Sequence, residues 1–482
     1  MPRGYTLHLG RAIPQYRQHT LCPPHQHVYA RANGNQRLAD RASRLPDVFH
    51  NQRSHINLSM DTHTDNPRHS QTARPLKWVP TLYFAEALPY MAVMTLSVVM
   101  YTNMGLSNTE LALYTSWLYL PWVIKPLWSP LIDTIRNERW WILATQTLIG
   151  ASLAGVALTL HTAVCLKLSL AFFWIMAFAS ATHDIAADGL YILRLDEREQ
   201  ALYVGWRSTF YRIGSIFCQG GLVILAGVLE GRCGIPIAWS LTVGLLAAIM
   251  VMLVMWHGHA LPHVHKASPP QLNLLSTFAA TLRAMSRKPR LVPSLLFMLL
   301  FRLPEAQLAK MATPFLLRSK EQGGLALDTA SVGFAYGTLG VVGLLGGGII
   351  AGWLVSRHGL KKWWWPMIAA ISLPDAVYIY LSLVQPDNIL LIDTCVFVEQ
   401  FGYGFGFTAY MLYLVYFAKG EMSTSVFSFC TALQALGMMI PGMVAGQIAD
   451  QYGFTNFFIW VMICTLVTFS VSAMVNVKDI KQ

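Results

Sequence analysis

Residues 180–221 read SATHDIAADGLYILRLDEREQALYVGWRSTFYRIGSIFCQGG and place polar, ionisable side chains inside two apolar runs, 172–193 and 202–228. Both runs are long enough to cross a bilayer as helices. The ionisable side chains within them are His183, Asp184, Asp188, Arg207 and Arg212. Charges inside such helices are costly and usually mark a functional site. The rest of the chain is therefore interpreted as a membrane scaffold around this helical hairpin.

The depth of these charges follows from the position of the turn. We place the turn at Arg198 and the helix ends near Leu193 and Leu202. With a rise of about 1.5 Å per residue, Asp184 and Arg212 then lie roughly 13–15 Å from those ends. This depth is close to the middle of a hydrocarbon core about 30 Å thick.

The spacing of the charges predicts which of them are neighbours. Asp184 and Asp188 are four residues apart and share one helix face. Counting outward from the same turn, Asp188 falls one residue from Arg207. Two interpretations stay open: a substrate or proton site, or a buried ion pair that only fixes the helix register.

Composition excludes an ordinary soluble protein. Hydrophobic residues make up 54% of the 482 and charged residues only 12%, and the mean hydropathy is +0.43. These values are typical of a chain that crosses a membrane many times. The net charge of +11 comes largely from Lys and Arg in loops between apolar runs, which indicates membrane topology and not nucleic-acid binding. The seven cysteines show no CxxC or metal-ligand spacing, so neither a metal nor another cofactor is expected.

Residues 1–75 differ from the rest because they are polar and irregular. We expect them to be disordered, or to be an extension upstream of a true start at Met60. On the second interpretation residues 1–59 are not translated.

From Lys77 onward the sequence contains twelve apolar runs of helix-spanning length. They cover about 77–101, 109–132, 140–160, 163–193, 202–228, 234–256, 291–317, 329–355, 363–384, 388–417, 423–448 and 454–476. The longest connection predicts a linker, 257–290, between two six-helix bundles, 76–256 and 291–482. Thirteen Lys and Arg residues in loops on the side of the N-terminus, against four on the other side, predict that both termini and the linker are cytoplasmic.

A short basic loop follows the second run and recurs after the eighth. The polar residues of the two loops are Asp133, Arg136, Arg139, Arg357, Lys361 and Lys362. This repeat resembles the pattern of major facilitator transporters, whose related halves enclose a site at mid-membrane. The expected fold is therefore an all-α membrane protein of the major facilitator type, with twelve transmembrane helices in two bundles. The loop residues are expected to act in its conformational switch.

Further charges lie within the other apolar runs: Glu86, Lys125, Arg302, Glu305, Lys310, Asp375, Asp393 and Glu399. In the fold that the chain resembles, the first, fourth, seventh and tenth helices line the cavity, and Asp375 in the ninth run is an exception. Counting residues from the loop brings Glu86 level with Lys125, and the two are expected to pair. Arg302 and Glu305 are three apart and can share a face.

A cavity with charges of both signs suits a zwitterionic or anionic solute. Proton exchange at Asp184 would couple its transport to the membrane potential. The expected substrate and proton pathway comprises Glu86, Lys125, His183, Asp184, Asp188, Arg207, Arg212, Arg302, Glu305 and Glu399.

Four segments carry a more specific resemblance. They are YFAEALP at 83–89, LPWVIKPLWSPLID at 120–133, THDIAAD at 182–188 and YRIG at 211–214. These segments are similar to those of the AmpG muropeptide permeases, which also resemble acetyl-CoA transporters. The resemblance implies a monomeric, multi-pass permease of the bacterial inner membrane. It would import anhydromuropeptides, GlcNAc-anhydroMurNAc with or without peptide, together with protons.

Other functions remain open. The substrate could be another anionic sugar, a peptide or an acyl-CoA-like metabolite. A membrane enzyme would use the carboxylates in acid–base chemistry, but the loops contain no nucleophile or metal cluster, so no enzyme is expected. A non-transporting receptor would need an effector surface, which only 257–290 offers.

Overall fold

The fold is seen in a computed structural model that describes residues 75–262, 274–420 and 422–475. All of these belong to one compact unit, His69–Gln482. The expectations for residues 1–74, including the alternative start, lie outside the described residues.

Every regular element in the described part of the chain is a helix. In the first half these are α1 (Val79–Met91), α2 (Ser97–Asn103), α3 (Asn108–Trp117), α4 (Leu120–Ile135), α5 (Glu138–Thr159), α6 (Cys165–Arg194), α7 (Glu197–Ile216), α8 (Val223–Cys233) and α9 (Ile235–Ala260). In the second half they are α10 (Leu274–Ser286), α11 (Leu291–Leu300), α12 (Leu303–Leu317), α13 (Thr329–Phe334), α14 (Val341–His358), α15 (Leu360–Ser372), α16 (Ala376–Val384), α17 (Ile389–Ala418) and α18 (Ser423–Met474). Segments of π-helix, Ala92–Leu96, Phe217–Leu222 and Ala335–Gly340, join α1 to α2, α7 to α8 and α13 to α14.

Ten helical stretches in the described residues are long and apolar enough to cross a membrane. The last of them, Ser425–Met474, has 50 residues and contains Gly453, whose φ of 77° and ψ of 163° separate two merged helices. The all-α, multi-pass fold predicted from the sequence is confirmed, and the predicted count of twelve transmembrane helices stays a prediction.

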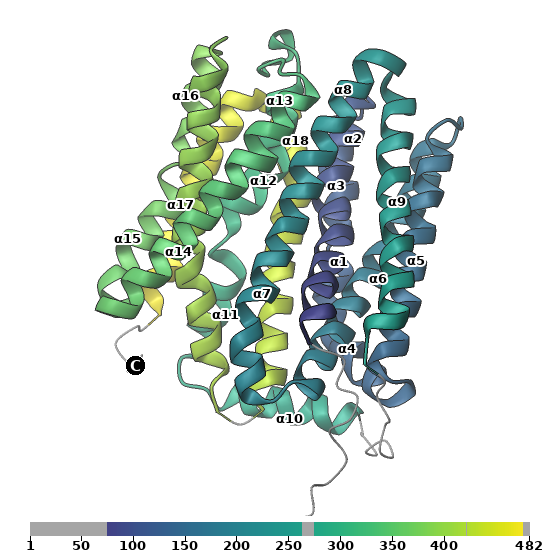
Figure 1. Cartoon of the computed structure of the whole chain (residues 1–482). Coiled ribbons are helices and arrows are strands. Elements are labelled where there is room, and N and C mark those ends of the chain that lie inside the picture. Colours follow the sequence, from purple (N-terminus) through teal and green to yellow (C-terminus); the bar gives the residue numbers. More distant parts are fainter. Residues whose placement is uncertain (1–74, 263–273, 421, 476–482) are drawn as a thin grey trace, which may run out of the picture. The chain divides into compact units, whose positions relative to one another are not determined.

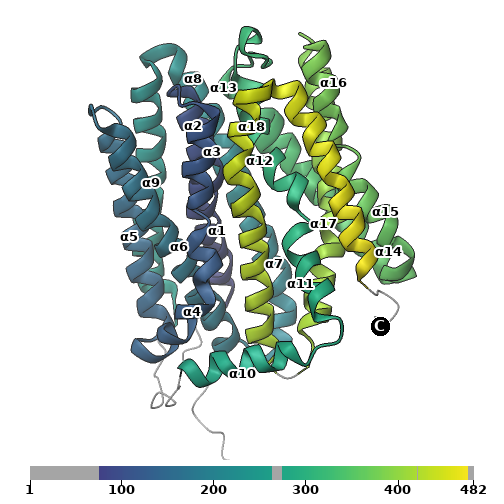
Figure 2. The same cartoon turned by 180° about the vertical axis from the view of Figure 1, so that it is seen from behind.

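Each half of the chain has its own large apolar cluster, one within residues 88–250 and another within residues 285–475. A further cluster joins Ala112 of α3 to second-half residues within 308–461. Figures 1 and 2 show the helices of the first half, α1–α9, on one side and α11–α17 on the other. Helix α7 of the first half and the first part of α18 lie at the boundary between the two sides. Helix α10 runs crosswise at the end where α1 begins. We call this the linker end and the opposite one the far end.

The hairpin within residues 172–228 turns earlier than predicted. Helix α6 continues to Arg194 and α7 begins at Glu197, so the turn is not centred on Arg198. The cause is a capping box: the Asp196 side chain accepts from the Glu199 N–H and the Glu199 side chain accepts from the Asp196 N–H. The Asp-x-x-Glu spacing is a known start signal for a helix.

Polar contacts join the two halves at the far end. Asn103 at the end of α2 donates to Glu230 at 2.8 Å and to Thr329 of the other half at 2.7 Å. The Asp450 carboxylate accepts from the backbone and hydroxyl of Thr109, both at 2.7 Å. Because Thr109 is in the first turn of α3, this negative charge also suits the helix dipole.

The backbones of α8 and α13 touch across the same boundary. A Cβ atom on Gly227 would lie 2.3 Å from the backbone nitrogen of Ala330, whereas one on Gly231 would meet nothing within 4 Å. The far end is therefore closed by a contact that tolerates no side chain at Gly227.

We predict that Gly227→Leu opens the far end, because the new side chain must push α13 away from α8. The measurement is the distance between spin labels at His161→Cys and Asp387→Cys, both in far-end loops, in a background without native cysteines. The distance should increase with Gly227→Leu and stay constant with the matched Gly231→Leu. An unchanged distance in both variants would show that the contact does not hold the far end closed.

Candidate functional site

A cavity of about 650 Å³ lies between the two halves. Its wall runs from Tyr90 and Tyr119 to Ser129, Ile192 and Phe427, near the linker-end termini of their helices. The first half contributes residues of α1, α4, α6 and α7, and the second contributes Arg302 and residues of α17 and α18. The cavity therefore extends toward the linker end, away from the closed far end.

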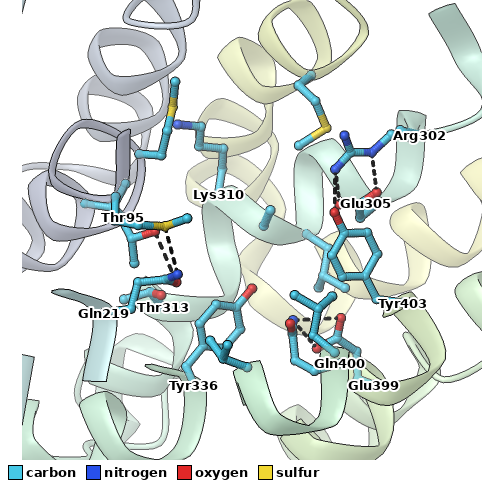
Figure 3. Close-up of a pocket in the computed structure, with 18 of the residues that line it drawn as sticks. Thr95, Gln219, Arg302, Glu305, Lys310, Thr313, Tyr336, Glu399, Gln400 and Tyr403 are labelled. Carbon is cyan, nitrogen blue, oxygen red and sulfur yellow. Dashed lines mark hydrogen bonds and ion pairs between the residues drawn. The ribbon is translucent and has the colours of Figure 1, made fainter. Parts of the chain in front are cut away.

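A smaller chamber of about 180 Å³ adjoins the cavity (Figure 3). The two share Tyr90, Tyr119, Arg302 and Met438 in their walls. The chamber is lined by residues of both halves, including Gln219 and Glu399. A bound solute can thus occupy a large cavity and a smaller polar chamber together.

An ion pair between α4 and α6 lies in the cavity wall. Lys125 contacts the Asp184 carboxylate, and their side chains are 21% and 23% exposed. This exposure is to the cavity, because both residues line it. The pair is thus accessible to a solute although it lies within membrane-crossing helices.

A second ion pair lies one helical turn along α6. The Arg207 guanidinium of α7 is 2.7 Å from Asp188 Oδ1, which also accepts a 3.1 Å hydrogen bond from the Tyr83 hydroxyl of α1. The same guanidinium stacks over the Tyr83 ring at 4.4 Å. The proximity of Asp188 and Arg207 expected from the hairpin is thus observed.

Glu86 completes an acidic group around these pairs. Oxygen atoms of Glu86, Asp184 and Asp188 lie within 4.8 Å of one another. Glu86 is 8% exposed and its Oε2 has no hydrogen-bond partner. With Lys125 and Arg207 as the neighbouring cations, the group has three carboxylates and two positive charges. A proton or a small cation can balance the remaining charge, and the expectation of no metal stays a prediction.

The second half presents its own ion pair. Arg302 donates to Glu305 from Nε at 2.7 Å and from Nη2 at 2.5 Å, and it donates to the Tyr403 hydroxyl at 2.8 Å. The guanidinium also lies over the Phe407 ring at 4.8 Å. The expected shared face of Arg302 and Glu305 is observed, and both residues line the chamber.

The expected pair between Glu86 and Lys125 is wrong, because Lys125 pairs with Asp184 instead. Counting residues from a loop gives depth but not the direction in which a side chain points. The π-helical segment Ala92–Leu96 shifts the helix face between Glu86 and that loop. The break at Leu118 and Tyr119 has a similar effect on the other side.

Four predicted pathway residues line neither the cavity nor the chamber: Glu86 and Arg207, which contact the charges of the cavity wall, and His183 and Arg212, which do not belong to those ion pairs. His183 is 1% exposed and its Nε2 lies 2.9 Å from Gln146 Nε2. Gln146 in turn accepts from His257 at 2.9 Å, so His183 belongs to a buried polar network behind α6. Arg212 is half-buried and lines neither the cavity nor the chamber.

The basic loops of the predicted switch have these positions. Arg139 donates to the Gly258 carbonyl, and Arg136 lies 5.9 Å from the Trp140 ring. Arg357 stacks over Trp353 at 4.2 Å. Lys361 and Lys362 are exposed in α15, and Asp133 lies in α4. Their role in switching remains a prediction.

Sequence reasoning missed most of the aromatic and amide groups of the site. Trp122 and Tyr211 line the cavity beside the charges, and Gln219 and Gln400 line the chamber. The signal was present for Tyr83, which lies three residues before Glu86 on one helix face. Lys310 was recognised as an intramembrane charge but was given no role.

Comparisons with known proteins agree with this architecture. Residues 81–442 match the model of the Major Facilitator Superfamily. The chain is 26% identical over 344 residues to the anhydromuropeptide permease of Escherichia coli (strain K12), covering 70% of this chain and 67% of that protein. It is 24% identical to the putative transporter AmpG 4 of Rickettsia conorii, covering 77% and 90%.

Solved structures show the same fold. The nucleoside transporter NupG aligns with a TM-score of 0.64 at 16% identity, covering 83% of this chain and 98% of that one. A D-xylose–proton symporter aligns with a TM-score of 0.63 at 12% identity, covering 84% and 99%.

The Lys125–Asp184 pair leads to a stability prediction. Lys125→Met should lower the melting temperature more than Lys125→Met combined with Asp184→Asn, because the single variant leaves a largely buried carboxylate without its cation. We expect a coupling of roughly 1–3 kcal/mol from the double-mutant cycle. The Lys320–Asp387 pair serves as control, since Asp387 is 91% exposed and its cycle should show little coupling. Additive effects at Lys125 and Asp184 would contradict the pairing.

Proposed function

Because the chain belongs to the major facilitator superfamily, a family of membrane transporters, we propose that it imports anhydromuropeptides together with protons. The substrate would be GlcNAc-anhydroMurNAc, with or without its peptide. We further propose that the protein is a monomer in a bacterial inner membrane, with both termini in the cytoplasm.

The cavity with paired charges is the observation that carries this proposal. Its volume of about 650 Å³ falls within the roughly 300–1,000 Å³ of ordinary ligand pockets. Tyr90, Tyr119, Trp122 and Tyr211 supply aromatic faces in its wall, which suit the apolar faces of sugar rings. The relatives whose printed names are anhydromuropeptide permease and AmpG support this substrate class.

Proton coupling is supported by the charge balance around Asp184. Three carboxylates share two cations, and carboxylates this close cannot easily all be ionised. A proton on this group would neutralise the excess charge during passage. Glu86 and Asp184 also line a recess of about 180 Å³ beside Trp122, through which a proton can reach Glu86. Movement of one charge through 100 mV is worth about 2.3 kcal/mol.

The test is uptake of radiolabelled GlcNAc-anhydroMurNAc, with and without peptide, by cells that lack their own permease and express this chain. We expect accumulation that an uncoupler abolishes and that Asp184→Asn reduces at least about tenfold, because the substituted amide cannot exchange a proton. Asp387→Asn, in an exposed far-end loop, is the matched control and should retain uptake.

Other outcomes distinguish the alternatives. Accumulation that survives the uncoupler would refute proton coupling while keeping the substrate. Binding without accumulation would favour a receptor. Absence of both, with the chain well expressed, would redirect the search to other anionic sugars, peptides or acyl-CoA-like metabolites.

A further inference from the structure

Lys310 is a buried cation that lacks an anionic partner among the described residues. It is 4% exposed, and its Nζ donates to the Thr115 hydroxyl at 3.1 Å. The ammonium also lies 5.1 Å from the Tyr119 ring centre. An ammonium has three donors, so this environment leaves it poorly compensated. Burial of a charge without a counter-charge is strongly unfavourable.

Glu399 is the corresponding anion without a cation. It is 4% exposed, and its carboxylate accepts from Gln400 at 3.0 and 3.3 Å. The Tyr378 hydroxyl lies 3.5 Å from its Oε2. In the described residues no Lys or Arg forms an ion pair with it.

Both residues line the same chamber. Figure 3 shows Lys310 and Glu399 on separate walls, with the chamber between them. The other two charges there, Arg302 and Glu305, already satisfy each other. One lysine amine and one glutamate carboxyl group without an ion-pair partner in the described residues therefore remain, and they line the same space without bonding to each other.

We propose that the chamber binds the zwitterionic end of the transported molecule, with its carboxylate at Lys310 and its ammonium at Glu399. This rests on the proposed function and specifies which part of the solute enters the chamber. A ligand with both charges would compensate both residues at once, whereas a singly charged ligand would leave one of them unpaired.

The shape of the site agrees with this assignment. The chamber, at about 180 Å³, is more than ten times the roughly 15 Å³ that one ordered water needs, which leaves room for an amino-acid end group. It adjoins the larger cavity at Tyr90 and Tyr119. The sugar part of a glycopeptide can therefore occupy the larger cavity while its peptide end enters the chamber.

The experiment pairs each residue with the ligand group that it is proposed to bind. The probe is GlcNAc-anhydroMurNAc linked to L-Ala-D-Glu-L-Lys. Two analogues have the lysine amine acetylated or its carboxylate amidated. Glu399→Gln should reduce uptake of the unmodified probe roughly tenfold or more, as expected for loss of a charge-assisted contact. It should leave the already weak uptake of the acetylated analogue unchanged.

Lys310→Met should reduce uptake of the unmodified probe. It should not reduce uptake of the amidated analogue further, because that analogue lacks the carboxylate that Lys310 is proposed to bind. Peptide-free GlcNAc-anhydroMurNAc is the internal control, and Glu399→Gln should retain its uptake. Equal losses for all probes would overturn the proposal. Uptake of none of them by the unsubstituted protein would instead count against the proposed function.

A binding measurement distinguishes failure of the zwitterion site from failure of the proposed transport function. The melting temperature of the purified protein should rise with millimolar free L-Ala-D-Glu-L-Lys and not with its derivative acetylated at both amines. The rise should disappear in Glu399→Gln, whereas Glu399→Asp should preserve it. A rise that is the same for both peptides, or none with either, would refute a zwitterion site whatever the uptake results are.

Discussion

A charged side chain inside a bilayer must find its counter-charge within the protein, and the arrangement of the helices around the cavity depends on this constraint. Lys125 of α4 reaches Asp184 of α6, and Arg207 of α7 reaches Asp188 one turn away. Both pairs join different helices, so they fix how these helices face one another. Because ion pairs are poor stabilisers compared with apolar packing, we attribute their presence to the solute that passes them.

The same constraint identifies where a ligand or proton acts. Glu86 adds a third carboxylate to a group with two cations, and in the second half Lys310 and Glu399 have no ion-pair partner in the described residues. The chamber is lined by two basic and two acidic side chains, but only Arg302 and Glu305 pair with each other. On the functions proposed above, a proton in the first half and a zwitterion in the second would supply the charges that the protein leaves unpaired.

Much of this could be predicted from sequence, because apolar runs and charges within them determine a membrane-crossing helical fold whatever its details. Depth was predictable only in part: Asp188 and Arg207 do meet, but the predicted equal depth of Asp184 and Arg212 is wrong, because Asp184 is 10 residues (194 − 184) from the end of α6 and Arg212 is 15 residues (212 − 197) from the start of α7. The direction in which a side chain points around its helix axis was not predictable. π-Helical segments such as Ala92–Leu96 rotate the side chains that follow relative to those that precede them, and for this reason the predicted pair of Glu86 and Lys125 is wrong. His183 is adjacent to Asp184 yet points into a different network, since consecutive residues of a helix face different directions. The Asp196 cap is readable from the Asp-x-x-Glu spacing, and this local signal locates the turn more closely than hydropathy does.

The two kinds of contact explain how such a molecule can change shape. Within each half, apolar cores such as those around Trp239 and Phe297 bury large side chains completely, which makes each half resist deformation. At the far end the halves are joined by hydrogen bonds such as those of Asn103 and Asp450. Each such bond contributes only about 0.5–1.5 kcal/mol net, and water can replace it. Several together amount to the few kcal/mol that separate interconverting conformations. Close backbone packing, such as that of Gly227 against Ala330, and the apolar cluster that joins Ala112 to the second half add to these bonds, so on the proposed transport function a ligand that rebalances the buried charges would have to offset both kinds of contact to open the boundary.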